Sequence, residues 1–396
     1  MSSKNISFII LLLMLMTCVA PLSMDIYLPS LVVIMNDFSA TYENAQLSLG
    51  LFIIGLGISQ LIYGPLSDKF GRIPILYFGL FIYMGATIIC ALSPSMGILN
   101  AARFLQGIGA CGAAVTSTAI ARDLFEGKES IKIFAKMATA IGCVPVLAPI
   151  LGTYFQQVFG WRSNFIFLLL FSLTLLSVSY LNLKETNINP DRKATHPKKL
   201  IQNYWHLLSH RKYLIYSCCS MLTFGALFSY VSNSPYYLIS LAGTSIEFFS
   251  VLFSLNALGF ISGAFITSKL SHKLSTDHLI AIGGLLLFAG GVLQAVMFCI
   301  FSINPFSIMM PMLICTFGIA MMMPSTMAAS LAPFPEMAGS ASALGGFIRF
   351  LGAAFIGALV GYIQTSQFLA LPIEMIISGA GVIFLIRLKS RASQAM

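Results

Sequence analysis

Asp25 is a carboxylic acid inside a long apolar stretch, where it could bind a proton or a cation. It lies four residues before Pro29. Because proline frees a backbone carbonyl about one turn earlier, we expect this helix end to be bent. A carboxyl group in a closed apolar cavity disfavours its charged form, so it could take up a proton near neutral pH. The alternative is an acid just inside the outer lipid headgroups.

Arg103 is a second charge at similar depth, in another apolar stretch. Gln106 and Gly107 follow three and four residues later and share its helix face. A guanidinium group stays charged, so it needs an acid or several carbonyl partners. We therefore predict that Arg103 pairs with Asp25 and tunes its proton binding. A purely structural ion pair is the alternative.

Arg349 lies near the middle of a third apolar stretch and is too deep to reach the interface easily. It is expected either to face a cavity and meet acidic or acceptor groups, or to pair with Glu374 of the last stretch. Other polar and aromatic side chains could line the same cavity, although tyrosines at the outer ends more often form an interfacial belt. The predicted cavity residues are Tyr27, Gln106, Tyr230, Asn233, Asn256 and Arg349.

The segment Gly64–Arg72 places breakers, an acid and two bases between two apolar stretches. We predict a short loop in which Gly64, Asp68, Gly71 and Arg72 form a cytoplasmic gate. A later helix begins near residues 335–340, and its N-terminus would attract the Asp68 carboxylate. The alternative is a solvated run of charges.

Two prolines stand four residues apart in a further apolar stretch, and each removes a helical hydrogen bond. Gly142 and Gly152 flank Pro145 and Pro149, and glycines there would let a neighbouring helix approach. We predict a bent, close-packed helix that suits rocking between two states. A kink without function is the alternative.

The elements that carry these residues are predicted to be membrane helices. The chain of 396 residues is 58% hydrophobic and only 9% charged, against about a quarter charged in soluble proteins. Apolar runs of about 20 residues can span a bilayer as helices, and strand-like alternation is absent. The first run lacks a clear cleavage site, so we expect it to be retained. The twelve predicted spans are 6–29, 44–66, 73–92, 98–121, 131–155, 162–183, 213–240, 247–268, 278–300, 306–331, 338–362 and 367–387.

The longest polar stretch, 184–212, divides these spans six and six. We predict an all-α polytopic membrane protein with two six-helix bundles around a central cavity. The bundles would comprise 1–183 and 213–396, joined by a central cytoplasmic loop at 184–212. Residues 263–269 occupy the second-half position of Gly64–Arg72 but lack its aspartate.

The charge distribution predicts the orientation. Of the 22 Lys and Arg, all but Arg103, Arg162 and Arg349 fall in or beside cytoplasmic segments if both termini are cytoplasmic. The anionic inner leaflet then explains the net charge of +9 without a nucleic acid partner. The eight cysteines lie within predicted spans without zinc-ligand spacing, so we expect no metal and no cofactor. We expect a monomer in the lipid bilayer.

Several of these stretches resemble the major facilitator superfamily. Gly64–Arg72 resembles its loop pattern G-x-L-x-D-x-x-G-R, and residues 103–109 resemble its fourth-helix pattern. Residues 142–152 look like its antiporter motif, with Ala148-Pro149 in place of Gly-Pro. Residues 24–29 and 160–162 look like the drug:proton antiporter branch of the bicyclomycin/chloramphenicol-resistance type.

The resemblance implies alternating access, a bacterial inner-membrane location, and coupling through Asp25 and Arg103. We therefore expect a proton-coupled exporter of drugs or small amphipathic metabolites. The alternatives are an importer of the same fold, or a dedicated exporter of one metabolite such as a siderophore. An enzyme is not expected, because no catalytic motif appears and the five histidines lie in or beside cytoplasmic connections.

Overall fold

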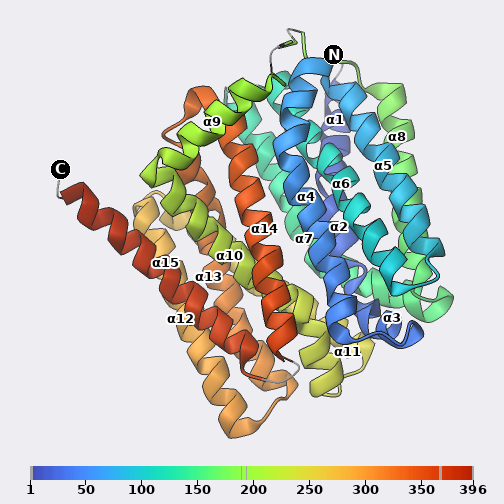
Figure 1. Ribbon diagram of the computed structural model, residues 1–396, viewed down its shortest axis with the longest axis vertical. Helices are drawn as coiled ribbons and strands as arrows, with labels where there is room; N and C mark the ends of the chain where they lie inside the picture. The colour runs from blue at the N-terminus through green and yellow to red at the C-terminus, as the bar shows by residue number, and fades with distance from the viewer. Residues whose placement is uncertain (1–2, 126, 189, 193, 365–367, 395–396) are drawn as a thin grey trace. The chain divides into compact units, whose positions relative to one another are not determined.

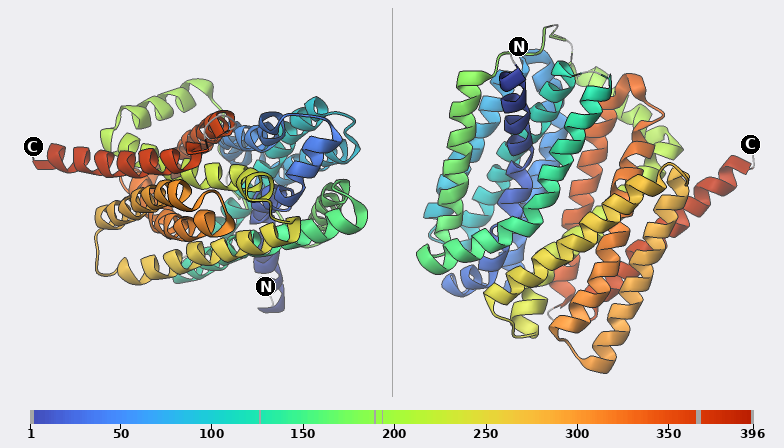
Figure 2. Two further views of the ribbon diagram at one scale, coloured as in Figure 1. Left: turned by 90° about the horizontal axis from the view of Figure 1, so that it is seen from below. Right: turned by 180° about the vertical axis from the view of Figure 1, so that it is seen from behind.

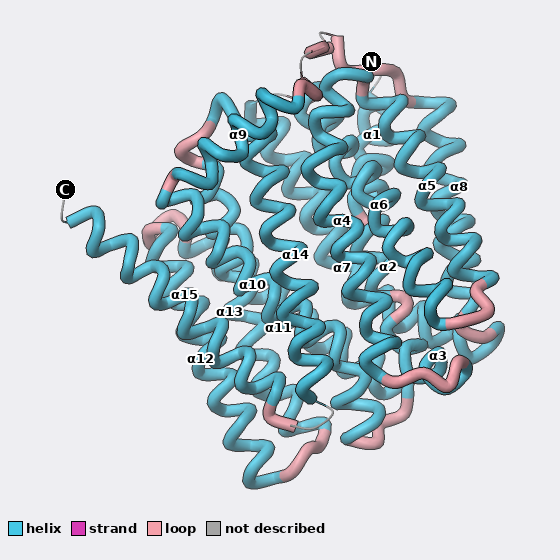
Figure 3. The backbone as a smooth tube through the Cα atoms, in the orientation of Figure 1, coloured by secondary structure: helices cyan, strands magenta, loops and turns pink. Residues whose placement is uncertain are grey.

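The computed structural model describes residues 3–125, 127–188, 190–192, 194–364 and 368–394. Every regular element in these ranges is a helix, as the backbone tube in Figure 3 shows. Twelve of the helices are long and apolar enough to cross a membrane. The protein is therefore an all-α, multi-pass membrane protein, which confirms the predicted fold class and number of spans.

The chain forms two compact units. The first contains residues 1–40 and 51–201, and the second contains residues 41–50 and 202–396. The helices that begin before residue 185 are, in chain order (Figure 1), α1 Ser3–Thr17, α2 Val19–Asp25, η1 Leu28–Ser30, α3 Leu31–Asp37, α4 Tyr42–Phe70, α5 Arg72–Leu92, α6 Met96–Leu124, α7 Gly127–Phe159 and α8 Arg162–Asn182.

The remaining helices begin with α9, which crosses from the first unit into the second. They are α9 Pro197–Ser209, α10 Arg211–Pro235, the π-helix η2 Tyr236–Leu241, α11 Ile246–Leu270, α12 Thr276–Phe301, α13 Pro305–Leu331, η3 Pro335–Met337, α14 Ala338–Gln364 and α15 Ala370–Gln394.

The N-terminal part of α4 groups with the second unit because of two polar side chains. The Tyr42 hydroxyl donates to the carbonyl of Ser232 at 2.8 Å, and Gln46 Nε2 donates to the carbonyl of Gly357 at 2.7 Å. The division into 1–183, 184–212 and 213–396 stays a prediction.

The first span is broken, so the predicted single helix over 6–29 is wrong. The helix stops between α1 and α2 at Cys18, and again between α2 and η1 at Ile26 and Tyr27. Pro21 and Pro29 explain both interruptions, because each lacks the N–H that would bond the carbonyl four residues earlier. The predicted irregularity near Pro29 is confirmed.

Gly64–Arg72 is mostly helical, so the predicted loop is also wrong. Helix α4 runs through Gly64 and Pro65 as far as Phe70. Only Gly71 leaves helical geometry, with φ of +98°, a conformation that glycine adopts without strain. The proline is tolerated because its fixed φ is helical and it removes a single hydrogen bond.

The predicted central loop contains the helix α9, which the high polarity of 184–212 concealed. Its charged residues cover one side only, and its apolar residues follow helical spacing on the other. Figure 1 shows this short helix beside the start of α10.

Glycines bring helix backbones together within each unit. A Cβ added at Gly79 of α5 would lie 2.8 Å from the Cα of Gly112 in α6. In the second unit, a Cβ at Gly379 of α15 would lie 2.5 Å from the backbone nitrogen of Phe288 in α12. Figure 2 shows the long helices of each unit running side by side from two further directions.

Candidate functional site

Asp25 is buried at an interruption of the first membrane helix. It is the last residue of α2, and only 4% of it is exposed. Within the described ranges no side chain or backbone group forms a hydrogen bond or an ion pair with its carboxyl group. The last carbonyls of a helix carry partial negative charge. Both burial and this position disfavour a carboxylate, so the group is suited to holding a proton.

Helix α7 packs directly against this interruption. A Cβ added at Gly152 would overlap the carbonyl oxygen of Ile26, the residue after Asp25. Pro145 and Pro149 lie inside α7, as predicted. The expected close approach is confirmed at Gly152 and wrong at Gly142, where an added Cβ would meet nothing within 4 Å.

Arg103 is fully buried in α6 and binds the end of α2. Its Nη1 donates to the carbonyl of Ser23 at 3.1 Å and to Gln106 Oε1 at 2.6 Å. The predicted ion pair with Asp25 is absent from the described ion pairs and is therefore wrong. The guanidinium group instead uses a backbone carbonyl that the helix interruption leaves available.

Aromatic rings surround the Arg103 guanidinium. Its Cζ atom lies 4.4 Å from the ring centroid of Phe52, 5.0 Å from that of Tyr27 and 6.0 Å from that of Phe165. Gly107 permits this packing, because an added Cβ there would overlap the carbonyl of Phe52 in α4. The faces of aromatic rings partly replace the water that the cation loses on burial.

A chain of buried hydrogen bonds connects Arg103 to α5. Gln106 Nε2 donates to Thr87 Oγ1 at 2.8 Å, and Thr87 Oγ1 donates to the carbonyl of Tyr83 at 2.6 Å. The Tyr83 hydroxyl shares a 2.5 Å hydrogen bond with Ser23 Oγ, which returns the chain to α2. Sequence reasoning missed Ser23, Tyr83 and Thr87. Ser23 could have been found as a polar residue in the same apolar stretch as Asp25, two residues before it.

Tyr27 and Gln106 were predicted to line a substrate cavity. In the structure both have 0% exposure and belong to the surroundings of Arg103. Three further predicted cavity residues are buried inside the second unit. Tyr230 stacks on Phe253, with centroids 5.7 Å apart, and Asn256 lies close to its hydroxyl. Asn233 donates to the carbonyl of Ser229 at 2.8 Å. Their roles in binding stay predictions.

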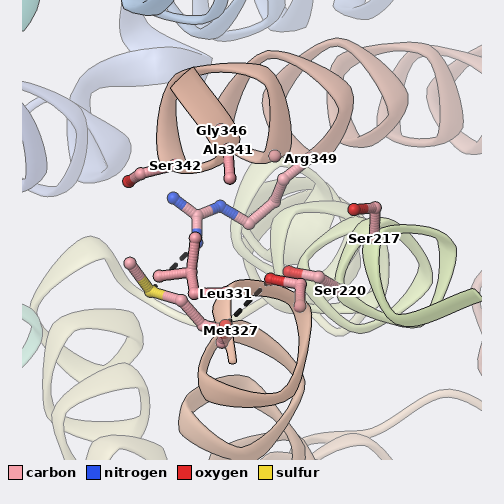
Figure 4. A pocket seen from close by; sticks show the side chains of 10 residues that line it. Ser217, Ser220, Met327, Leu331, Ala341, Ser342, Gly346 and Arg349 are labelled. Atoms are coloured by element: carbon pink, nitrogen blue, oxygen red, sulfur yellow. Dashed lines mark hydrogen bonds between the residues drawn. The ribbon is translucent and has the colours of Figure 1, made fainter. Parts of the chain in front are cut away.

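Arg349 lines a cavity in the second unit. The cavity is partly open and has a volume of about 20 Å³. Figure 4 shows the Arg349 side chain extending from α14 toward Met327 of α13, with Ser217 and Ser220 of α10 beside it. Ser330 and Ser342 complete the hydroxyl-bearing part of the wall.

The predicted pair between Arg349 and Glu374 does not form in the described part of the chain. Glu374 accepts a hydrogen bond from Ser378 Oγ at 2.6 Å. Arg349 Nη1 has only the weak acceptor Met327 Sδ at 4.0 Å, and its Cζ lies 4.7 Å from the ring centroid of Phe350. The sequence shows that both residues are deep, but it does not show toward which neighbour each turns.

The junction between α4 and α5 is held by a group of acids around Arg72. Arg72 Nη1 contacts Asp68 Oδ1 at 2.5 Å, and Arg72 Nε contacts Asp123 Oδ2 at 3.0 Å. The Glu185 carboxylate accepts from the backbone N–H groups of Arg72 and Ile73, the first residues of α5. Sequence reasoning missed Asp123 and Glu185, although each is a rare acid beside the end of a predicted span. Docking of Asp68 onto residues 335–340 stays a prediction.

Twelve apolar helices, two compact units and charges buried inside the helices define a multi-pass membrane protein. A family model described as Major Facilitator Superfamily matches residues 13–357. The chain belongs to this family of transporters.

Two relatives and one solved structure are similar over nearly the whole length. The chain is 32% identical to an uncharacterised MFS-type transporter, YdgK, of Bacillus subtilis (strain 168), over 94% of this chain and 92% of the relative. It is 28% identical to a bicyclomycin resistance protein homologue of Haemophilus influenzae, over 91% of this chain and 90% of the relative. This similarity confirms the resemblance to the bicyclomycin-resistance type.

A crystal structure of a mutant of the peptide transporter POT, in complex with sulfate, has the same fold. The TM-score is 0.77 at 15% identity, covering 96% of this chain and 94% of that one.

Proposed function

We propose that the protein is a proton-coupled exporter of drugs or small amphipathic metabolites that works by alternating access. It would reside in a bacterial inner membrane with both termini in the cytoplasm. The observation that carries the proposal is the buried Asp25 carboxyl group, which has no ionic or hydrogen-bonding partner in the described ranges. The similarity to a bicyclomycin resistance protein homologue supports a drug as the substrate.

Asp25 would hold the transported proton. In a closed site the neutral acid is favoured, because a charge at this depth costs about 2.5–3.5 kcal/mol on insertion scales. Water or substrate reaching the site would favour the carboxylate and release the proton. The same group then serves proton and substrate in alternation, which is the requirement for exchange.

Arg103 would be a positioning residue for this proton site. It holds the carbonyl of Ser23, two residues before Asp25, and therefore fixes the backbone at the end of α2. By fixing this backbone, Arg103 would keep the Asp25 carboxyl group in its buried position. Movement of α2 relative to α6 would change this support, so the proton affinity would depend on conformation.

Arg72 would stabilise one end of the first unit while the transporter changes state. It joins α5 to the last turn of α4 through Asp68 and to α6 through Asp123. We propose that Gly64, Asp68, Gly71 and Arg72 act as the cytoplasmic gate, with Asp68 engaging the start of the helix at residues 335–340 in the closed state.

The proposal is tested in everted inner-membrane vesicles, where export appears as uptake into the lumen. With an acidic lumen, adding bicyclomycin should move protons out, recorded as recovery of a quenched acridine dye. Asp25→Asn should abolish this recovery at equal expression. The matched control is Asp37→Asn, since Asp37 lies at the end of the same broken helix but is half exposed and paired with Arg162.

Bicyclomycin is one member of a drug panel to be screened in the same assay. Compound-dependent proton movement that persists in Asp25→Asn would refute the assignment of the proton site. Proton and drug moving in the same direction would support an importer instead.

A further inference from the structure

We propose that the Arg349 cavity binds the anionic head of an amphipathic organic anion, such as an aromatic carboxylate. The inference rests on the proposed transport function and adds the substrate class. It is carried by a half-buried cation, Arg349, that forms no ion pair with the described residues of the second unit.

The guanidinium group of Arg349 is left with unused donors. Arg349 Nε is buried without a hydrogen-bond partner among the described residues. By contrast, the half-buried Lys389 in the same unit contacts Asp277 and Tyr216, both at 2.5 Å. A charge that is partly withdrawn from water favours a partner, and a planar guanidinium fork fits a carboxylate in a bidentate manner.

The walls of the cavity match such a ligand. Four serines contribute hydroxyl groups, which can donate to an anion without adding a competing negative charge. Met327, Leu331 and Ala341 contribute the apolar part of the lining. A ligand with an apolar body and an acidic head fits both kinds of lining residue.

The size of the cavity limits what can enter. Space of about 20 Å³ for a water-sized centre accommodates one small group, since a single water needs roughly 10–15 Å³ by the same measure. The site therefore takes the acidic head of the compound and not the whole molecule. Gly345 and Gly346 keep the α14 side of the cavity free of bulk.

The test compares two probes of equal shape, 1-naphthoate and neutral 1-naphthamide, by equilibrium dialysis against the purified full chain in detergent. We expect the wild type to bind the carboxylate at least about tenfold more tightly. Arg349→Met should remove this preference, and Arg349→Lys should keep part of it. Arg211→Met is the matched control, because Arg211 is exposed at the start of α10 and lies outside the cavity.

Equal binding of both probes by the wild type would overturn the proposal, as would an unchanged preference in a folded Arg349→Met protein. The double variant Ser220→Ala/Ser342→Ala provides a second test if Arg349→Met fails to fold; it should weaken carboxylate binding severalfold, and unchanged binding would count against the site. Dialysis measures binding without transport. Its result therefore does not depend on whether the vesicle assay detects proton coupling.

Helix α9 has an exposed apolar side. We infer that this side lies in the headgroup region of the bilayer leaflet nearest the start of α10. Ile201, Trp205 and Leu208 are 67%, 72% and 37% exposed and follow one another by four and three residues, so they share one helix face. Three large apolar side chains on one short helix face form a patch that water covers poorly.

Other residues of the protein cover only the side of α9 that lies next to this exposed apolar face. Leu207 has 0% exposure, and the ring of Phe334 contacts His206 and His210 with centroids 6.0 Å and 4.9 Å apart. This anchors one side of α9 to the second unit and leaves the Trp205 side uncovered.

Position and charge identify a bilayer as the occupant. A single residue, His210, separates α9 from the membrane-spanning α10, so α9 must lie near the membrane surface. Lys198, Arg211 and Lys212 are exposed at its two ends, and basic residues beside an apolar face attract anionic lipid headgroups.

Tryptophan fluorescence in nanodiscs tests this inference. The chain has only two tryptophans, and Trp161 is 4% exposed, so the difference between wild type and Trp205→Phe isolates the Trp205 signal. Lipids brominated near the headgroup end of the acyl chains should quench that signal by about half or more. An unquenched signal that aqueous iodide quenches instead would overturn the inference.

Discussion

The two deeply placed arginines differ in their acceptors and in their burial. Arg103 has 0% exposure and donates through Nη1 to a carbonyl and an amide, while its Nε and Nη2 have no hydrogen-bond partner among the described residues. Arg349 is half-buried, lines a serine-bearing cavity, and among the described residues has only a sulfur atom as an acceptor. The depth of a charged residue in a membrane protein therefore does not by itself define its role. The hydrogen-bond acceptors around the guanidinium group decide whether it positions the backbone or remains available to a ligand.

The largest expected difference comes from replacing each arginine with methionine. Arg103→Met would leave the Ser23 carbonyl and Gln106 Oε1 without this donor, and should lower the free energy of unfolding by about 1–3 kcal/mol. Arg349→Met removes a charge whose acceptor is a sulfur atom and leaves no oxygen acceptor without its donor, so it should leave stability unchanged or raised. Thermal unfolding in detergent measures both. Equal destabilisation by the two substitutions would contradict the comparison.

The next largest difference is expected when a glycine near each site is replaced by alanine, which adds one methyl group. Gly152→Ala forces a Cβ onto the Ile26 carbonyl beside Asp25 and should destabilise by about 1–3 kcal/mol while impairing transport. Gly345→Ala in the Arg349 cavity adds a Cβ only 3.5 Å from the Tyr213 hydroxyl, an ordinary contact. It should be neutral, or stabilising by up to about 1 kcal/mol through helix propensity. The unfolding temperature and vesicle efflux of both variants measure this difference. A larger loss in Gly345→Ala than in Gly152→Ala would contradict the prediction.

The smallest effect concerns single hydroxyl groups. Tyr83→Phe removes the hydrogen bond to Ser23 Oγ and should lower the free energy of unfolding by about 0.5–1.5 kcal/mol. The matched substitution at the second site, Ser342→Ala, should change it by less than about 0.5 kcal/mol. Chemical denaturation of both variants and the wild type measures the two changes. Equal free energies of unfolding for the two variants would show that the hydrogen bonds around Arg103 do not stabilise the protein.

The sequence predicted the architecture better than the details of the site. Apolar length sets the number of spans, so that number could be predicted from hydropathy. The helix boundaries were wrong at residues 6–29 and at Gly64–Arg72, where prolines have opposite effects. Pro21 and Pro29 accompany interruptions, whereas Pro65 lies inside a continuous helix. Tertiary packing decides between these outcomes, and a single sequence does not record it.

At the site, sequence reasoning found the charges and missed their partners. The depth of Asp25 and Arg103 follows from their positions along the spans. The acceptor of Arg103 is the backbone carbonyl of Ser23, which lies in the last turn of α2 and is available because the helix ends there. Pairing by opposite charge therefore gave the wrong partner, as it did for Arg349 and Glu374. Helix rotation and freed carbonyls are three-dimensional facts that side-chain identity does not reveal.

Proton release from the purified protein tests the central claim most directly. A transported compound from the drug panel is added to the detergent-solubilised chain in weak buffer, and a pH indicator counts the protons set free. We predict about one proton per chain from the wild type and from Asp37→Asn, and none from folded Asp25→Asn. Release from Asp25→Asn equal to that of the wild type would contradict the account, because the proton would then come from another group.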